Sequence, residues 1–198
     1  LRGENCELEM VAGGCDADCH KRRFKTKLIS MAMSGYDRVI VEPSGIFDVD
    51  EFFDTLYEEP LDAWYEAGNV IAVVDAGLEE ELSQQSEYFL ASQTASAGRI
   101  VLSHTDEVSE ETIRRTIIHL KGAVEKAKCR QEIEKKIICK GFRALGAADF
   151  AELSCCGYCA ADYVKMSPGQ DGGFQSLFFM KLQMSQEQFQ EIDRKSVV

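Results

Sequence analysis

The sequence predicts an α/β fold in which a mainly parallel sheet carries helices on both faces. Three short apolar segments, residues 39–41, 70–74 and 100–102, are rich in Val and Ile and are expected to be buried strands. Segments with apolar residues at helical spacing lie between and after them, and such alternation is typical of parallel sheets. A chain of 198 residues is long enough to bury a sizeable core.

Composition and charge exclude several classes of protein. No apolar run approaches the roughly 18 residues that a membrane span needs, and the chain does not start with a signal-peptide layout. A net charge of −12 argues against a nucleic-acid partner, because phosphate binding needs a basic surface. Eight cysteines in a chain of this length are too sparse for a disulfide scaffold and favour free thiols in a reducing cytoplasm.

The first third of the chain predicts one edge strand and two helices. Residues 6–11 alternate between apolar and polar side chains, as a short edge strand does. Apolar residues at helical spacing predict a helix over 21–34, with a basic first turn, and an amphipathic helix over 49–57. Trp64 and Tyr65 are expected to lie in the loop that follows.

The middle of the chain predicts further helices and a last short strand. A polar helix is expected over 86–97, with Gly98 as its C-terminal stop. Ser109 is expected to cap the next helix, which is followed by a strand at 136–140 and a helix at 147–153. The buried stripe of the helix that follows Ser109 is predicted to consist of Ile113, Ile117, Leu120 and Val124.

The C-terminal part predicts a domain boundary. Residues 167–173 (SPGQDGG) form the clearest linker in the chain, which divides a first domain at 1–166 from residues 174–198. The latter begin with an alternating strand pattern, and Ser185 with Gln188 forms a capping-box pattern for a helix. We expect this segment to be the first βα piece of a C-terminal α+β domain.

The turn after the first buried strand is a candidate ligand site. Glu42 and Gly45 belong to the sequence EPSG, at the carboxyl end of the predicted strand, where open α/β sheets bind ligands. The carboxylate could hold a magnesium ion through water, and the glycine N–H could face a terminal phosphate. The alternative is an ordinary exit from a strand with a solvated glutamate.

Several motifs follow one another along the chain: GGC, a helix, EPSG, VVDA, Q-x-x-x-A, IVLSHTD and the segment 136–153 (KIICKGFRALGAADFAEL). Their order, over most of residues 6–195, resembles the CobW family of GTPases, which belongs to the same class as the nickel-insertion GTPases of urease and hydrogenase. It implies a P-loop-NTPase-like domain, so that residues 1–166 would be a nucleotide-binding domain. It also implies a protein that binds and hydrolyses GTP with magnesium and delivers cobalt or zinc to a client metalloprotein or metal-cofactor pathway enzyme.

The resemblance assigns roles to individual residues. Glu42 matches the acid that helps to hold magnesium and assists catalysis, and Gly45 matches the glycine that faces the γ-phosphate. Asp106 matches the aspartate that reads the guanine base, although it could instead be an N-terminal cap of the next helix. The family usually has Asn or Thr and then Lys where this chain has Ser103 and His104, and His104 could stack on the base instead of the lysine stem.

The phosphate-binding signature G-x-x-x-x-G-K-[ST] does not occur in the 198 residues. In the family it lies before the cysteine motif, so we expect the chain to be an incomplete GTPase whose first strand–loop–helix precedes Leu1. Without that loop the chain is not expected to hydrolyse GTP. The missing strand would leave an exposed sheet edge at residues 39–41, through which a partner or a second copy could associate.

The cysteines form two further candidate sites. The family's Cys-x-Cys-Cys motif binds a transition metal, and here Cys15, Cys19 and His20 provide three possible ligands for zinc. Asp16 and Asp18 interrupt the motif, and the alternative is two surface thiols beside a solvated histidine.

The second cysteine cluster consists of Cys155, Cys156 and Cys159, to which the resemblance assigns no role. It could be a rubredoxin-like half-site, a redox pair or a set of ordinary thiols.

Two functions other than a GTP-dependent metal chaperone therefore stay open. One is a non-catalytic thiol metal-binding or partner-binding module that has lost nucleotide binding. The other is a thiol redox protein, which would need a cation near Cys156 or Cys159.

Overall fold

The computed structural model describes residues 6–11, 17–45, 49–129, 131–160, 185 and 188, without the side chains of residues 17–19. The chain divides into two compact units, Leu1–Ser167 and Pro168–Val198. The predicted linker at 167–173 and the predicted strand at the start of the second unit lie outside the described residues.

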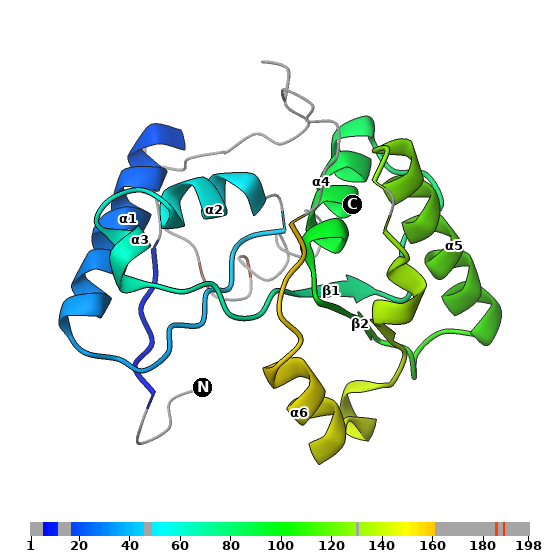
Figure 1. Cartoon of the computed structure of the whole chain (residues 1–198). Helices are drawn as coiled ribbons and strands as arrows, with labels where there is room; N and C mark the ends of the chain where they lie inside the picture. Colours follow the sequence, from blue (N-terminus) through cyan, green and yellow to red (C-terminus); the bar gives the residue numbers. More distant parts are fainter. Residues whose placement is uncertain are drawn as a thin grey trace. The chain divides into compact units, whose positions relative to one another are not determined.

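The first unit alternates helices and strands, as the sequence predicts (Figure 1). Its α-helices are α1 (Ala17–Met33), α2 (Val49–Leu56), α3 (Leu61–Trp64), α4 (Gln84–Ser96), α5 (Glu110–Lys126) and α6 (Ala147–Ser154). Its strands are β1 (Ile71–Asp75), β2 (Arg99–Ser103) and β3 (Ile137–Ile138), and the 3-10 helices are η1 (Ile133–Lys136) and η2 (Phe142–Ala144). In the described part of the chain, no helix has the length and apolar character to span a membrane.

The strands form one parallel sheet in the order β1-β2-β3. The register of the first pair runs from Ile71 opposite Arg99 to Asp75 opposite Ser103. Helix α4 connects β1 to β2, and helix α5 lies between β2 and β3 in the chain. This confirms the predicted parallel α/β fold and places the carboxyl ends of β1 and β2 side by side.

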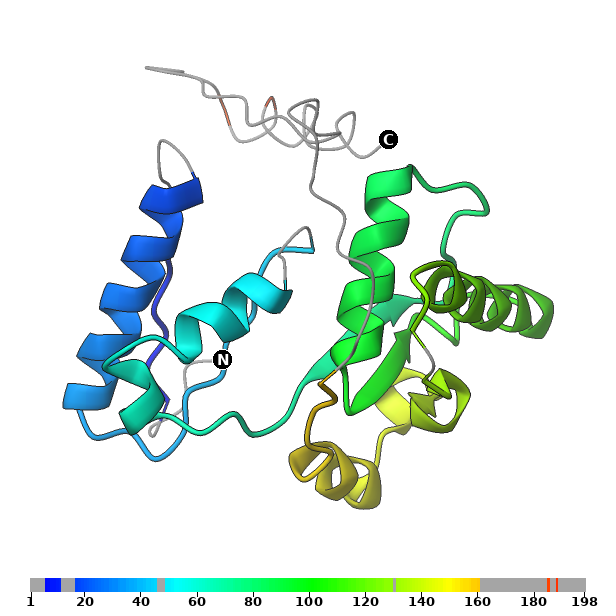
Figure 2. The same ribbon diagram turned by 45° about the horizontal axis from the view of Figure 1, so that its top comes forward.

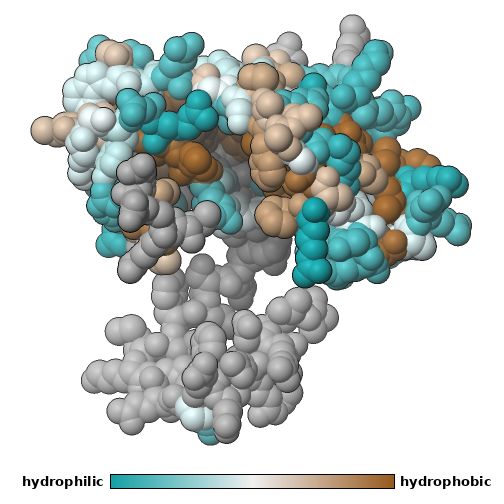
Figure 3. Space-filling model, turned by 90° about the horizontal axis from the view of Figure 1, so that it is seen from below, coloured by the Kyte–Doolittle hydropathy of each residue, from teal (hydrophilic) through white to brown (hydrophobic). Residues whose placement is uncertain are grey.

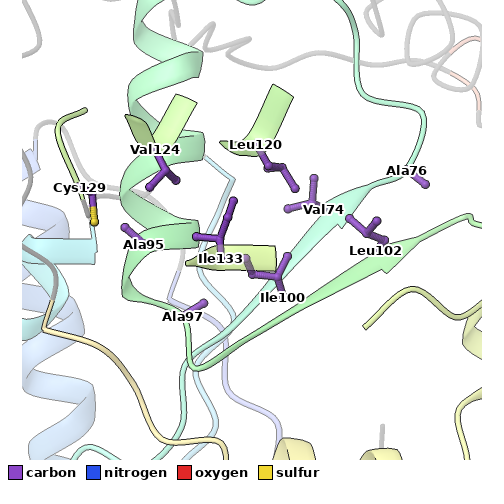
Figure 4. Packing of buried hydrophobic residues seen from close by; sticks show 10 residues of the cluster. All are labelled: Val74, Ala76, Ala95, Ala97, Ile100, Leu102, Leu120, Val124, Cys129 and Ile133. Atoms are coloured by element: carbon purple, nitrogen blue, oxygen red, sulfur yellow. The ribbon is translucent and has the colours of Figure 1, made fainter. Parts of the chain in front are cut away.

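The hydrophobic core lies between α4, α5 and one face of the sheet (Figures 1, 2 and 4). Ile100, Leu102 and Leu120 are fully buried, and Val124 is 1% exposed. Each such side chain contributes about 1.5–3 kcal/mol through its removal from water. The predicted stripe of α5 is confirmed, since its other two members, Ile113 and Ile117, pack partly buried against the same cluster.

The other face of the sheet is open in the described part of the chain. Val73 is 69% exposed and Ile71 is 41% exposed, and the only strand that pairs with β1 among the described residues is β2. Apolar residues also reach the surface in the space-filling view (Figure 3). Helices α4 and α5 therefore cover one face of the sheet, and no described strand pairs with the outer edge of β1.

Two predicted strands are wrong. Residues 39–41 and 6–11 are not strands, and Ile40, Leu8 and Met10 are 86%, 63% and 81% exposed. Both segments have a composition that is typical of strands. A strand also needs a neighbouring strand to pair with its N–H and C=O groups. Neither segment has one among the described residues, so the apolar character of residues 39–41 does not lead to burial.

The first three helices pack on one another. Leu28 of α1, Leu56 of α2 and Leu61 of α3 are 4%, 5% and 0% exposed, and the hydroxyl of Tyr65 donates to the carbonyl oxygen of Leu28 at 2.7 Å. The loop expected around Trp64 is partly wrong, because α3 ends at that residue. Burial of Leu61 fixes this short helix, which the polar sequence around it did not indicate.

Gly98 is required by a close backbone approach. Helix α4 ends at Ser96 with Ala97 as its cap, so Gly98 directly follows the helix at the predicted stop, although it lacks the positive φ of a typical glycine cap. A Cβ atom on Gly98 would lie 2.4 Å from the carbonyl oxygens of Cys156 and Gly157. The N–H of Val70 donates to Gly157 at 2.9 Å, and the N–H of Gly98 donates to Val70 at 2.9 Å. These hydrogen bonds hold the cysteine-rich turn (residues 155–159) against the residues that directly precede β1 and β2.

Two predicted helix caps are confirmed. The Ser109 hydroxyl accepts from the N–H of Thr112 at 3.1 Å at the start of α5. In the second unit, the N–H of Gln188 donates to the hydroxyl of Ser185 at 3.2 Å, and the N–H of Ser185 donates to the Gln188 side chain at 3.0 Å. These two contacts form the predicted capping box.

Candidate functional site

The carboxyl ends of β1 and β2 bring together residues from two distant motifs. Asp75 lies opposite Ser103 in the sheet register, and His104 and Asp106 follow directly on the turn after β2. In open α/β sheets, ligands bind at this edge. The structure therefore places the predicted residues Ser103 and His104 next to Asp75, which belongs to the VVDA motif but was not predicted as a site residue.

A hydrogen-bond chain fixes the side chains at this edge. The Asp75 carboxylate contacts the His104 ring, with Oδ2 3.0 Å from Nδ1, and its Oδ1 accepts from the N–H of Gly77 at 2.7 Å. The Ser103 hydroxyl donates to the carbonyl oxygen of Val74 at 3.3 Å and lies 3.3 Å from the His104 Nδ1. The histidine is thus held between two side chains that come from different strands.

The backbone of His104 adopts an uncommon conformation. Its φ is 54°, in the left-handed region that non-glycine residues rarely occupy. Its carbonyl oxygen accepts from the N–H of Glu107 at 2.9 Å, which closes the turn. Strain of this kind concentrates at ligand sites, and the ring is 53% exposed, so a ligand could reach it.

Asp106 lies against the loop that follows β3. A Cβ atom on Gly141 would lie 3.3 Å from both Cγ and Oδ1 of Asp106, so a larger residue there would make this carboxylate shift by a few tenths of an ångström. The alternative in which Asp106 caps α5 is not supported, because Ser109 fills that role. Gly141 was missed as a site residue, although the segment containing it was part of the resemblance.

The EPSG turn is anchored elsewhere. Glu42 is exposed in an irregular segment, and the carbonyl oxygen of Gly45 accepts from the side chain of Gln93 in α4 at 2.9 Å. Within the described ranges, no hydrogen bond or ion pair joins Glu42 to Asp106. The resemblance assigns the two acids to opposite ends of one bound nucleotide, and that assignment stays a prediction.

The predicted zinc ligands fall mostly outside the described residues. Cys15 is among the residues that are not described, Cys19 is described only by its backbone in α1, and His20 is half-buried. No group of three or more His, Cys, Asp or Glu side chains that could hold a metal ion occurs among the side chains that are described. The Cys15, Cys19 and His20 site therefore remains a prediction.

The second cysteine cluster has a cationic neighbour that the sequence did not reveal. The Lys136 ammonium donates to the sulfur of Cys159 at 3.2 Å and to the carbonyl oxygen of Ala97 at 3.0 Å. Burial raises the pKa of the Cys156 thiol, which makes it a poorer nucleophile. Cys155, Cys156 and Cys159 are free thiols. Lys136 was missed because it approaches Cys159 only in the folded chain.

Comparison with known proteins identifies the family. The family described as CobW/HypB/UreG, nucleotide-binding domain, matches residues 1–133, which is about two thirds of the 198 residues. Comparisons with curated proteins and with solved structures each gave no match. The match includes β1, α4, β2 and α5, and with them Asp75, Ser103, His104 and Asp106. The fold is the P-loop-NTPase-like α/β fold, and the chain belongs to the CobW/HypB/UreG family of nucleotide-binding domains.

Proposed function

We propose that this chain is the guanine-reading part of a GTP-dependent metal chaperone. The observation that carries the proposal is the exposed Asp106 carboxylate beside Gly141, with His104 on the same turn. A carboxylate can accept hydrogen bonds from both the ring N–H and the exocyclic amine of guanine, and adenine does not offer this pair. The ring of His104 would take the place of the lysine stem that usually covers the base.

At the phosphate end of the proposed nucleotide site, this chain offers fewer binding groups than at the base end. Glu42 and Gly45 are proposed to contribute to magnesium and to the γ-phosphate, and magnesium bound to phosphates needs only one or two protein carboxylates. The lysine and hydroxyl of a P-loop are not present in the 198 residues. We therefore infer weak GTP binding and no measurable hydrolysis by this chain alone. GTP turnover by the purified chain would contradict that inference.

Base selectivity can be tested with nucleoside diphosphates. We expect the chain to bind GDP more tightly than ADP in an NMR titration, because Asp106 accepts two hydrogen bonds from guanine only. In Asp106→Asn the side chain gains a donor, which suits the carbonyl at the corresponding position of xanthine, so preference should move from GDP to xanthosine diphosphate. Glu107→Gln removes an exposed charge from the same turn and should leave the preference unchanged. Equal binding of GDP and ADP by the wild type would refute base reading.

The proposed cargo is cobalt or zinc, held by Cys15, Cys19 and His20. Thiolate and imidazole ligands suit both ions, and the three residues lie within six positions of the sequence. A titration with Zn²⁺ or Co²⁺ should give one bound ion per chain, which Cys15→Ser/Cys19→Ser removes. Unchanged stoichiometry in the double variant would refute this assignment.

A second candidate function is a thiol redox protein, and the contact between Lys136 and Cys159 favours it. An ammonium beside a sulfur is typical of reactive thiols. Alkylation by iodoacetamide, followed by mass spectrometry, should then be faster at Cys159 than at the exposed Cys139, and Lys136→Met should abolish the difference. Equal rates at both thiols would argue against this candidate.

The proposed partners are a client metalloprotein and a second copy of the chain. The sheet edge predicted at residues 39–41 is wrong, because these residues are not a strand. Self-association is instead supported by the outer edge of β1, which no described strand pairs and where Val73 is 69% exposed. Sedimentation should show a mass that rises with concentration, and Val73→Lys should suppress the rise because lysine protects edge strands. A monomer at all concentrations would refute this proposal.

A further inference from the structure

We propose that Asp75 is a positioning residue for the base site, because it fixes the orientation of the His104 ring next to the base-reading Asp106. This inference rests on the proposed guanine binding and extends it to a residue outside the SHTD sequence. It starts from the contact between Asp75 Oδ2 and His104 Nδ1, 3.0 Å apart.

The Asp75 carboxylate is itself oriented from its other side. The N–H of Gly77 donates to Oδ1 at 2.7 Å, which leaves Oδ2 for the histidine. A Cβ atom on Gly77 would lie 3.3 Å from the same Oδ1, so a larger residue there would crowd the carboxylate. The register of β1 with β2 sets the distance between Asp75 and His104, because Asp75 lies opposite Ser103, the residue directly before His104. Both carboxylate oxygens of Asp75 therefore have a defined hydrogen-bond partner.

The contact determines which ring nitrogen carries the proton. An ionised carboxylate only accepts hydrogen bonds, so Nδ1 must be the protonated nitrogen. The Ser103 hydroxyl does not compete as a donor, because it donates to the carbonyl oxygen of Val74. A neutral His104 thus keeps Nδ1–H toward Asp75 and leaves Nε2 as an acceptor. The ring is fixed in one tautomer and one orientation.

A fixed ring has a consequence for ligand binding. The His104 side chain is 53% exposed, and without Asp75 an exposed ring would sample several rotamers. A ring that is already held in place loses less freedom when a base stacks on it. Loss of the contact should therefore weaken guanine binding about two- to tenfold, the range that aromatic contacts of this kind contribute.

The first test measures the ring without nucleotide. Two-bond ¹H–¹⁵N NMR spectra of the full chain should show His104 with the proton on Nδ1. In Asp75→Asn, the amide oxygen is needed as the acceptor of the Gly77 N–H, so the NH2 group faces Nδ1 and should move the ring proton to Nε2. Glu107→Gln removes a charge from the same turn, does not touch the ring through any hydrogen bond that the structure describes, and should keep the wild-type pattern. A wild-type proton on Nε2, or no change in Asp75→Asn, would overturn the inference.

The second test measures binding. Asp75→Ala removes the contact with the His104 ring and should weaken GDP binding about two- to tenfold in an NMR titration, whereas the same change in a His104→Ala background should have no further effect. Additive losses would overturn the positioning role, and so would unchanged GDP affinity in Asp75→Ala. If the wild type does not bind GDP, the proposed function fails, and the tautomer measurement still reports separately whether Asp75 orients His104.

Discussion

The side-chain amide of Gln93 in α4 donates a hydrogen bond to the carbonyl oxygen of Gly45, 2.9 Å away. The contact joins two motifs that are 48 residues apart in the sequence. It fastens the EPSG turn to a helix of the core, although the segment before the turn is not part of the sheet. The position of Glu42 therefore depends on α4.

Gln93→Ala should loosen this turn. Loss of one hydrogen bond should lower the free energy of unfolding by about 0.5–1.5 kcal/mol, measured by urea denaturation. Amide hydrogen exchange of Ser44 and Gly45 should become faster. Gln84→Ala changes an exposed glutamine in the first turn of the same helix and serves as the control. Unchanged exchange at both amides would show that the turn is held by other contacts.

Gly98→Ala should be strongly destabilising. The added methyl group would lie 2.4 Å from two backbone carbonyl oxygens, which cannot move aside as a flexible side chain could. We expect a loss of about 1–3 kcal/mol in the free energy of unfolding. Gly122→Ala is the matched control, because it lies in α5 with no atom within 4 Å of the added Cβ, and it should stabilise the chain by about 0.5–1 kcal/mol. Similar effects at both positions would contradict the close approach at Gly98.

Glu58 should make the stability of the first three helices depend on acid pH. Hydrogen bonds from Lys21 and Lys25 lower the pKa of its carboxyl group from an ordinary 4.5 to about 2. Because the pKa is lower in the folded chain, the stabilisation is complete above pH 4.5 and is lost as the pH falls through about 2.

Glu58→Gln should therefore be less stable than the wild type at pH 7, with a difference that narrows as the pH falls to about 2. Thermal unfolding at a series of pH values would measure it. Glu66→Gln changes an exposed acid near the same helices and should parallel the wild type. A constant difference between Glu58→Gln and the wild type across this range would contradict the assignment.

Leu120→Ala should remove a large part of the core. The side chain is fully buried between α5 and the sheet, and such truncations lower the free energy of unfolding by about 2–5 kcal/mol. Ile118→Ala, two residues earlier on the same helix, changes a side chain that is 70% exposed and should stay within about 0.5 kcal/mol of the wild type. Chemical denaturation of both variants would decide, and equal losses would mean that the face of α5 has been wrongly assigned.

Local sequence signals predicted most of the helices and the three strands that the structure describes, β1, β2 and β3. Helical spacing gave α5 with its buried stripe, and Ser109 and the pair Ser185 and Gln188 were predicted as caps because capping depends on neighbours within a few residues. Residues 39–41 were mispredicted for the opposite reason. The composition of a segment indicates whether its side chains suit a buried strand. A strand forms only if a second strand elsewhere in the fold pairs with it.

The candidate site was predictable only in part. Ser103, His104 and Asp106 could be found because they are consecutive or nearly so after a strand. Asp75 and Gly141 became site residues through the sheet register and the loop after β3, which depend on tertiary structure.

The fastening of the cysteine-rich turn to Val70 and Gly98 has a consequence for where this domain can be cut. The match to the family ends at residue 133, yet the carbonyl oxygen that receives the N–H of Val70 belongs to Gly157, and β3 begins at Ile137. A chain trimmed to residues 1–133 would lose β3 and the hydrogen bond from Val70 to Gly157, which holds the cysteine-rich turn at the amino ends of β1 and β2. The region that matches the family is therefore shorter than the part of the chain that completes the sheet.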